Sequence, residues 1–257
     1  MERSELWQKL YLSGMDESGP ALARQHGLGL ELTDFCVAAN LEDPDRRRAA
    51  VGRQEGIGRF WLHAPFAELF PCAIDPLARE MARRRYAQTV ETAEVLGIRR
   101  VVIHGGFVPL VYFPEWYVEQ SVLFWRSFLP LVPPEMTLAL ENVMEPDPTL
   151  LAAIAAGVDD SRLRLCLDVG HANSCVGKVP PLEWIEPMAP WLCHVHLHNN
   201  EGTWDLHAPL GEGSVPMEPV LDKLLTLCPD ATYTIENQNC AASLVWLRDK
   251  GFGGTDT

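Results

Sequence analysis

The stretch WLCHVHLHNNEGTWDLHAPLGEG, residues Trp191–Gly213, decides how this chain of 257 residues is interpreted. Its first part alternates apolar residues with histidine. Side chains on one face of a β-strand recur at every second residue, so we predict a strand over Leu192–His198. A polar loop with Asp205 and His207 follows, and then a glycine turn. Four histidines and one aspartate within fourteen residues favour a metal site over a solvated surface strand, because imidazole is the commonest metal ligand.

Outward from this stretch, short apolar runs alternate with helical patterns along the whole chain. The predicted strands cover Leu10–Ser13, Leu28–Phe35, Arg59–Phe66, Arg99–Gly106, Met136–Asn142, Arg162–Gly170, Leu192–His198 and Thr232–Asn237. The clearest predicted helices cover Asp43–Glu55, Asp75–Leu96, Pro114–Leu131, Asp147–Ala156, Leu182–Met188 and Met217–Leu227. Strands that alternate with helices without a break in composition predict an α/β fold, a single (β/α)8 TIM barrel domain over residues 1–257.

Composition narrows the class of partner. The formal net charge is −14, which disfavours nucleic acid because phosphate backbones are bound largely through Lys and Arg. The seven cysteines are scattered without a CxxC pair, which is typical of reduced thiols. The N-terminal residues lack the apolar run of a signal peptide, and no segment is apolar enough to cross a membrane. We therefore expect a cytoplasmic protein that acts on a small molecule.

Each predicted strand from the third onward ends in a residue that can bind a metal ion. These residues are His63, His104, Glu141, Asp168, His196 and Glu236. The carboxyl ends of the strands meet at one mouth of a TIM barrel, so we expect the six side chains to share a pocket. Any one of them could be a helix N-cap or a hydrogen-bonded core residue. Together they predict a metal site, because buried carboxylates repel one another unless cations pair them.

Three more residues, His171, Asp205 and His207, lie just beyond these strands. They could hold a further ion or orient the other ligands through hydrogen bonds. His194 and His198 share the parity of His196, so the alternation cannot choose among the three histidines. Position along the strand favours His196 as the ligand, with His194 deeper in the barrel and His198 above its rim.

The motifs at the strand ends resemble those of the xylose isomerase-like TIM barrel superfamily, which includes endonuclease IV and tagatose 3-epimerase-type enzymes. They are His63-Ala64-Pro65, Val102–Gly106 (VIHGG), Leu140-Glu141-Asn142, Leu167–His171 (LDVGH), His194–His198 (HVHLH), Asp205-Leu206-His207, Gly211-Glu212-Gly213 and Ile235-Glu236-Asn237. The resemblance runs from His63 to Glu236. As a set, the motifs are specific for the superfamily but not for one reaction.

The resemblance implies divalent metal ions, with zinc or manganese expected, at one to three per chain. In the epimerase branch, one ion is held by the positions of Glu141, Asp168, His196 and Glu236, and the position of His171 contacts substrate. In the endonuclease IV branch, the same four positions hold one of three zinc ions. The other two are held by His63, His104 and Glu141, and by His171, Asp205 and His207. Suitable residues fill all these positions.

Two activities follow from the resemblance. The first is isomerisation or epimerisation of a sugar or sugar phosphate, with Glu141 and Glu236 moving a proton beside a carbonyl and His171 binding the neighbouring oxygen. An aromatic wall for that substrate is expected from Tyr112, Phe113, Trp116 and Trp204. The alternative is an endonuclease IV-like, multi-zinc phosphoesterase. A barrel that only binds a metal or sugar is a third interpretation.

The sequence departs from the motifs of both the epimerase branch and the endonuclease IV branch, so the choice between the two activities stays open. Asn199 replaces an Asp that is common after the seventh-strand motif, and residues 199–203 lack the Arg of the epimerases. Phe66 stands where endonuclease IV has Tyr. The loops Phe107–Glu115 and Ala172–Pro181 carry Lys178 alone as a basic residue, which makes DNA an improbable substrate. The sequence does not determine the substrate, the metal, or whether the chain forms a homo-oligomer.

Overall fold

Eight parallel strands close into a barrel in chain order in this computed structural model, which describes residues 1–174 and 176–253. The strands are β1 (Leu10–Ser13), β2 (Gly29–Leu32), β3 (Phe60–His63), β4 (Arg100–His104), β5 (Thr137–Glu141), β6 (Leu163–Asp168), β7 (Leu192–Leu197) and β8 (Thr232–Ile235). The barrel closes through β1, which pairs with both β2 and β8. The predicted TIM barrel is confirmed.

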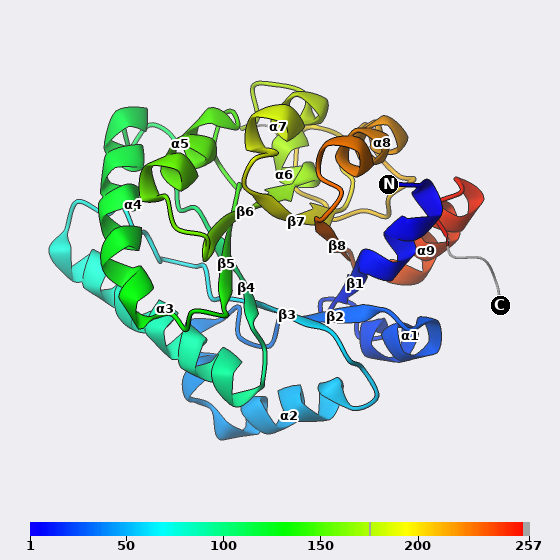
Figure 1. The fold of residues 1–257 in the computed structure, drawn as a ribbon, viewed down its shortest axis with the longest axis horizontal. Helices are drawn as coiled ribbons and strands as arrows, with labels where there is room; N and C mark the ends of the chain where they lie inside the picture. The colour runs from blue at the N-terminus through cyan, green and yellow to red at the C-terminus, as the bar shows by residue number, and fades with distance from the viewer. Residues whose placement is uncertain (175, 254–257) are drawn as a thin grey trace.

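Helices surround the barrel, as the view down its axis shows (Figure 1). The α-helices are α1 (Gly19–His26), α2 (Pro44–Gln54), α3 (Pro76–Val95), α4 (Pro114–Phe128), α5 (Thr149–Val158), α6 (Val169–Asn173), α7 (Pro181–Met188), α8 (Met217–Leu227) and α9 (Cys240–Asp249). Short 3-10 helices are η1 (Arg3–Lys9), η2 (Ala38–Glu42) and η3 (Leu129–Leu131). The main apolar core lies between this ring of helices and the outer face of the strands.

Local signals in the sequence set where the helices begin and end. The side chain of Asp75 accepts a hydrogen bond from the Leu77 amide at 2.8 Å, and Pro76 occupies the first turn of α3. The predicted helix Pro114–Leu131 instead ends at Phe128 and continues as η3, because Pro130 has no N–H to extend the α-helical ladder.

The first predicted strand matches β1, but the other predicted strands extend past the observed carboxyl ends. The sixth was expected to run to Gly170, but β6 ends at Asp168. The Asp168 carboxylate caps the following turn by accepting a hydrogen bond from the His171 amide at 2.6 Å, and α6 begins at once. The last residue of β6 is therefore both a helix cap and part of the mouth of the barrel.

The interior of the barrel is filled at its amino end by packed side chains. Tyr11, Trp61, Val102, Ala139 and Cys166 form a separate buried cluster there. Gly29 lies against Tyr11, and a Cβ at position 29 would overlap the tyrosine ring, so this strand position requires glycine. This packed layer fills the barrel beneath the polar residues of its carboxyl-end mouth.

Candidate metal centre

All nine predicted ligands lie at the carboxyl ends of β3 to β8 or in the segments that follow. His63, His104, Glu141, Asp168 and His196 belong to β3, β4, β5, β6 and β7 in turn. His171 lies in α6, Asp205 and His207 lie in the loop after β7, and Glu236 follows β8 directly. The closed barrel brings together residues that are up to 173 positions apart, from 63 to 236.

Together with His198, their side chains form three adjacent groups, in each of which one ligand atom per residue lies within 4.8 Å of the others. The first cluster is His63, His104 and Glu141. The central cluster is Glu141, Asp168, His196 and Glu236. The third cluster is His171, His198, Asp205 and His207. Glu141 belongs to two clusters, which suits a carboxylate that bridges two ions.

Three of the imidazoles have their tautomer set by a backbone carbonyl. Nδ1 of His63 lies 2.8 Å from Ala64 O, Nδ1 of His171 lies 2.9 Å from Asn142 O, and Nδ1 of His207 lies 2.8 Å from Glu236 O. A carbonyl only accepts hydrogen bonds, so each Nδ1 must carry the proton. In the neutral rings, the Nε2 lone pairs are then turned towards the clusters, as a metal ligand requires.

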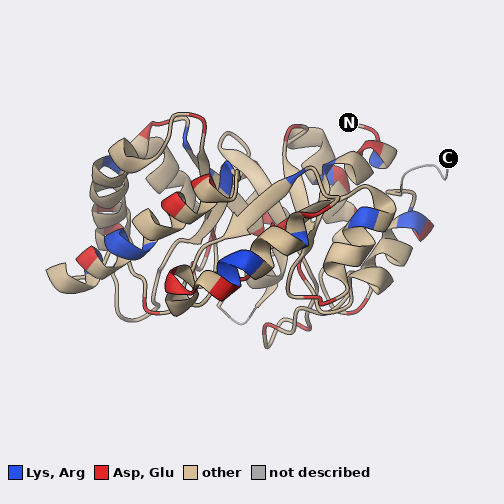
Figure 2. Cartoon of the chain, turned by 90° about the horizontal axis from the view of Figure 1, so that it is seen from below, with Lys and Arg blue, Asp and Glu red and all other residues tan. Residues whose placement is uncertain are grey.

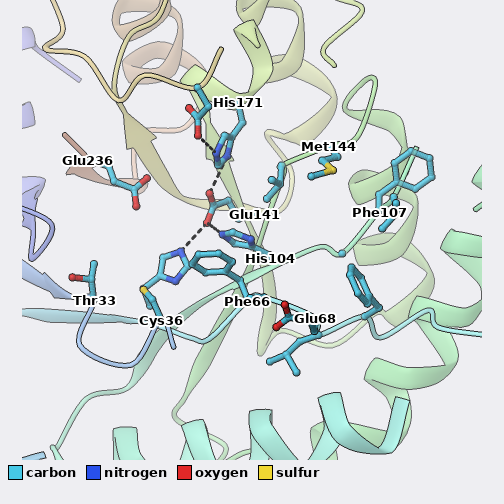
Figure 3. A pocket seen from close by; sticks show the side chains of 18 of the residues that line it. Thr33, Cys36, Phe66, Glu68, His104, Phe107, Glu141, Met144, His171 and Glu236 are labelled. Carbon is cyan, nitrogen blue, oxygen red and sulfur yellow. Dashed lines mark hydrogen bonds and ion pairs between the residues drawn. The ribbon is translucent and has the colours of Figure 1, made fainter. Parts of the chain in front are cut away.

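Those lone pairs face carboxylate oxygens. His63 Nε2 lies 3.4 Å from Glu141 Oε2, and His104 Nε2 lies 3.6 Å from the same oxygen. Figure 3 shows the His104 ring directed at Glu141. At His63, where Nδ1 already carries a proton, the Nε2 lone pair and Glu141 Oε2 repel each other unless a second proton or a metal ion lies between them. The arrangement at His63 therefore requires a cation.

The third cluster repeats this pattern around one carboxylate oxygen. Asp205 Oδ2 lies 3.2 Å from His171 Nε2 and 3.0 Å from His207 Nε2. Without a metal ion, burial disfavours a charged imidazole at His207, but the bond to Asp205 and further carboxylates outweigh it and raise the pKa of His207 to about 9. A proton or a metal ion is thus strongly favoured here.

Buried oxygens without a hydrogen bond point to the same requirement. Both carboxylate oxygens of Glu141, Oε2 of Glu236 and Oδ1 of Asp205 are inaccessible and have no hydrogen-bond partner. Nδ1 of His196 is also without one. Buried polar atoms are nearly always satisfied, so a group of unsatisfied acceptors fits divalent cations well.

His104 differs from its neighbours. Burial in the mouth, with cationic neighbours in the metal-free state, lowers its pKa to about 3 despite the carboxylate of Glu141. It is therefore a neutral imidazole under ordinary conditions, which is the form that binds metal ions.

His196 was predicted as a ligand, and its ring lies between two buried carboxylates. Nδ1 lies 2.9 Å from Glu236 Oε2, while Nε2 lies 3.1 Å from Glu31 Oε1 on the other side. Glu31 is fully buried in β2, and its Oε2 also accepts a hydrogen bond from the Thr234 hydroxyl at 2.6 Å. The acceptor Glu31 assigns the proton to Nε2 and turns Nδ1 towards the central cluster.

Sequence reasoning missed Glu31, although a signal was present. It is one of two acidic residues, with Asp34, in the predicted strand LGLELTDF, and it lies between two leucines at the parity of an inward-facing side chain. His194 lies deeper than His196, as expected, and completes a buried group with Glu31. The ring of His194 stacks on Trp61 at 4.1 Å between centroids.

His198 lies just past Leu197, the last residue of β7, in agreement with its expected place beyond the strand. His198 is fully buried, and its Nε2 lies 2.9 Å from Asp168 Oδ1. Its ring stacks on that of His207, with centroids 3.9 Å apart. Gly170 makes this possible, since a Cβ at position 170 would overlap the imidazole of His198. His198 therefore joins the third cluster.

The loop that carries Asp205 and His207 is anchored by two asparagines. The Asn199 Oδ1 atom accepts hydrogen bonds from the amides of Asn200 and Val215, and its Nδ2 donates to Leu210 O at 2.9 Å. Asn200 donates to Gly170 O at 2.8 Å. The Asn at position 199 thus holds the loop in place through backbone contacts.

A cavity of about 640 Å³ opens from the clusters. Seven of the nine predicted ligands reach its wall, while Asp168 and His196 lie beneath it. The expected aromatic wall is wrong, because none of Tyr112, Phe113, Trp116 and Trp204 lines this cavity. The loops fold so that Trp116 donates to Cys72 O at 3.0 Å, while Phe113 and Trp204 project into solvent.

The fold and this mouth define a class of protein, a TIM barrel with adjoining clusters of buried metal-ligand residues. The family model described as "Xylose isomerase-like TIM barrel" matches residues 20–248, so the chain belongs to that family. Curated relatives include "Uncharacterized protein MJ1311" of Methanocaldococcus jannaschii, 28% identical over 69% of this chain and 64% of that protein. The match therefore spans just under two thirds of that relative. "Probable endonuclease 4" of Mycobacterium leprae is 22% identical over 75% of this chain and 79% of its own.

Solved structures agree with the fold. The TTHB071 protein of Thermus thermophilus, in a structure described as "soaking with ZnCl2", has a TM-score of 0.78 and 27% identity, covering 96% of this chain and 100% of that chain. A "D-tagatose 3-epimerase-like protein" also has a TM-score of 0.78, with 23% identity over 95% of this chain and 97% of its own. Among the described residues, no helix combines the length and apolarity needed to cross a bilayer.

Proposed function

We propose that this chain is a multinuclear, metal-dependent hydrolase that cleaves phosphodiesters. The observation that carries the proposal is the placement of His63, His104, Asp205 and His207. A site for one ion needs the central cluster alone, yet these four residues form two further clusters beside it. Two of these imidazoles have their tautomer set for metal binding by backbone carbonyls.

Charge supports an anionic substrate. The ligands include four carboxylates, Glu141, Asp168, Asp205 and Glu236. With neutral imidazoles, one divalent ion would leave a net charge of about −2, and three ions would leave about +2. Counted over these ligands alone, a net positive charge that attracts a phosphate arises only with all three ions, because none of the described residues that line the cavity is Lys or Arg.

The reaction adds water across one P–O ester bond. The water oxygen bonds to phosphorus, the ester oxygen leaves with the electron pair, and the products are a phosphate monoester and an alcohol. Divalent cations held at the clusters would neutralise phosphate charge and acidify water. Glu236 reaches the cavity wall and is the carboxylate placed to take the proton of the attacking water. Its backbone carbonyl also holds His207, which ties the two clusters together.

A second candidate is the sugar isomerase or epimerase activity. Glu141 and Glu236 share the central cluster, which suits a pair of groups that remove and return a proton. In that activity, His171 would bind the substrate oxygen. The chain has a fold neighbour described as "D-psicose 3-epimerase with D-tagatose" at a TM-score of 0.65 and 16% identity, which supports the shared fold alone.

The two candidates are separated by one pair of assays on the zinc-loaded and the manganese-loaded chain. We expect release of p-nitrophenol from bis(p-nitrophenyl) phosphate, and no deuterium uptake into D-fructose or D-tagatose in D2O. Glu141→Gln should lower phosphodiester cleavage by at least about a hundredfold. Glu135→Gln is the matched control. Glu135 is exposed just before the start of the same strand, β5, and its variant should retain activity. Deuterium uptake without p-nitrophenol release would overturn the proposal in favour of the isomerase.

A further inference from the structure

The cavity beside the clusters has an apolar half that metal binding does not use. Its wall is built from loops that follow β3, β4 and β5. The apolar side chains are Phe66, Leu69, Phe70, Phe107, Val108, Val143 and Met144. In Figure 3, Phe107 and Met144 lie on the far side of the cavity from Thr33 and Glu236, with His104 and Phe66 between them.

From this wall, and resting on the proposed hydrolase activity, we infer that the substrate is a phosphodiester with a bulky apolar arm. One part of the cavity would take the phosphate at the clusters, and the apolar half would take the arm. The cavity volume of about 640 Å³ lies in the range of sites that bury most of a small organic ligand.

Few polar groups line the cavity apart from the metal ligands. The other described side chains that could bind a hydroxyl are those of Thr33, Cys36 and Glu68, and Thr33 lies across the cavity from the apolar half (Figure 3). A polyhydroxylated arm would lose its hydrogen bonds to water without replacing them, which costs free energy for every unpaired group. The wall therefore disfavours a sugar as the arm.

The charge of the cavity disfavours a nucleic acid strand. A strand carries further phosphates on both sides of the scissile one, and these need basic partners. The described lining offers none, and Glu68 adds a negative charge. Figure 2 shows Lys and Arg mainly along the outer helices of the barrel. A substrate with a single phosphodiester charge and an uncharged arm fits better.

Aromatic and sulfur-containing side chains make the wall suited to a flat group. The Phe66 ring stacks on His104 with centroids 4.5 Å apart and stays about two-fifths exposed, so one edge remains free for contact. Met144 is also about two-fifths exposed at the cavity mouth. Rings and thioethers both contact aromatic ligands favourably. A fused aromatic arm is therefore the best probe.

The test uses the zinc-loaded full chain and p-nitrophenyl esters that share one leaving group but differ in the other arm. The arms are methyl, naphthylmethyl and 5′-thymidyl. We expect kcat/KM for the naphthylmethyl ester to exceed that of the methyl ester by about tenfold or more, since apolar pockets discriminate to this degree. The thymidyl ester should fall below the naphthylmethyl ester. A naphthylmethyl ester no better than the methyl ester, or worse than the thymidyl ester, would overturn the inference.

A matched pair of variants assigns the preference to this wall. Met144→Gln should reduce the naphthylmethyl-to-methyl ratio by about threefold or more. Met81→Gln changes a methionine of nearly equal exposure on α3, away from the cavity, and should leave the ratio unchanged. An unchanged ratio in Met144→Gln would show that the arm binds elsewhere and would overturn the inference.

Binding separates this inference from the proposed function. Methyl(naphthylmethyl)phosphinate and dimethylphosphinate carry the charge of a phosphodiester but no ester bond. Calorimetry with the zinc-loaded chain should show tighter binding of the naphthylmethyl compound. If the naphthylmethyl compound bound more tightly but none of the esters was hydrolysed, the proposed hydrolase activity would be refuted and the binding of an apolar arm would stand. Hydrolysis of all three esters at equal efficiency would keep the hydrolase and refute the arm.

Discussion

The Nε2 atom of His196 lies 3.1 Å from Oε1 of Glu31, so a carboxylate buried beneath the mouth fixes the ring of a residue in the central cluster. Burial by itself would raise the pKa of Glu31, but the neighbouring His196 and His194 hold that pKa well below its usual range. Glu31 is thus an ionised acceptor in a place that water does not reach. It assigns the imidazole proton to Nε2 and leaves Nδ1 for a metal ion.

We predict that Glu31→Gln lowers zinc affinity by about tenfold to a hundredfold, because the amide can no longer act as a purely accepting partner of His196. Competition with a chelator of known affinity measures the change. Glu55→Gln, at the exposed end of α2, should bind zinc as the unaltered chain does. Equal affinity in the two variants would show that Glu31 does not position His196.

Replacement of Gly170 should disturb the third cluster. A Cβ in Gly170→Ala would overlap the imidazole of His198, so the ring must leave its place between Asp168 and His207. We expect about 1–3 kcal/mol of destabilisation and a loss of zinc.

Chemical unfolding and elemental analysis measure both effects. The matched change Gly52→Ala places a methyl group in open space within α2 and should stabilise the chain by up to about 1 kcal/mol with full zinc content. If Gly170→Ala kept its stability and its zinc, the packing of His198 would not support the third cluster.

Glu145 makes the stability of the folded chain depend on pH, and it does so independently of the metal ligands. Burial raises the pKa of this carboxyl above 4.5, although the Tyr117 hydroxyl at 2.6 Å and the Val143 amide at 2.8 Å oppose the rise. Between the ordinary and the raised pKa, the folded chain binds more protons than the unfolded chain. The stability of the folded state therefore falls as pH rises through this window.

Glu145→Gln removes the buried charge and can keep both hydrogen bonds. We expect the variant to gain stability relative to the unaltered chain as pH rises from about 5 to about 8, by up to about 1.4 kcal/mol for each unit of the pKa rise. Urea unfolding at saturating zinc measures the difference at each pH. A difference that stayed constant, or that shrank with rising pH, would contradict a raised pKa.

The TIM barrel and the meeting of the six strand-end residues at its mouth could be predicted from sequence, because both depend on regular features. Strand ends are readable from the pattern of apolar residues, and the barrel topology brings those ends together. Glu31 was missed because its contact with His196 joins strands 165 residues apart, and only the closed barrel reveals it. The aromatic wall was wrong because loop conformation after β4 and β7 has no periodicity from which to predict it.

His198 shows the limit of reasoning from strand position alone. Its parity and its place beyond the end of β7 were predicted, but its full burial and its part in the third cluster were not. The space that its ring occupies is left by Gly170 of a neighbouring segment. Such a contact between two loops is a property of the assembled mouth and not of either local sequence.

The most direct test is the number of zinc ions per chain after loading and removal of free metal, measured by elemental analysis in the unaltered chain and in His63→Ala and Asp205→Ala. We predict close to three ions in the unaltered chain, with about one fewer in each variant, since these residues lie in different clusters. One ion per chain in all three proteins would contradict the multinuclear account.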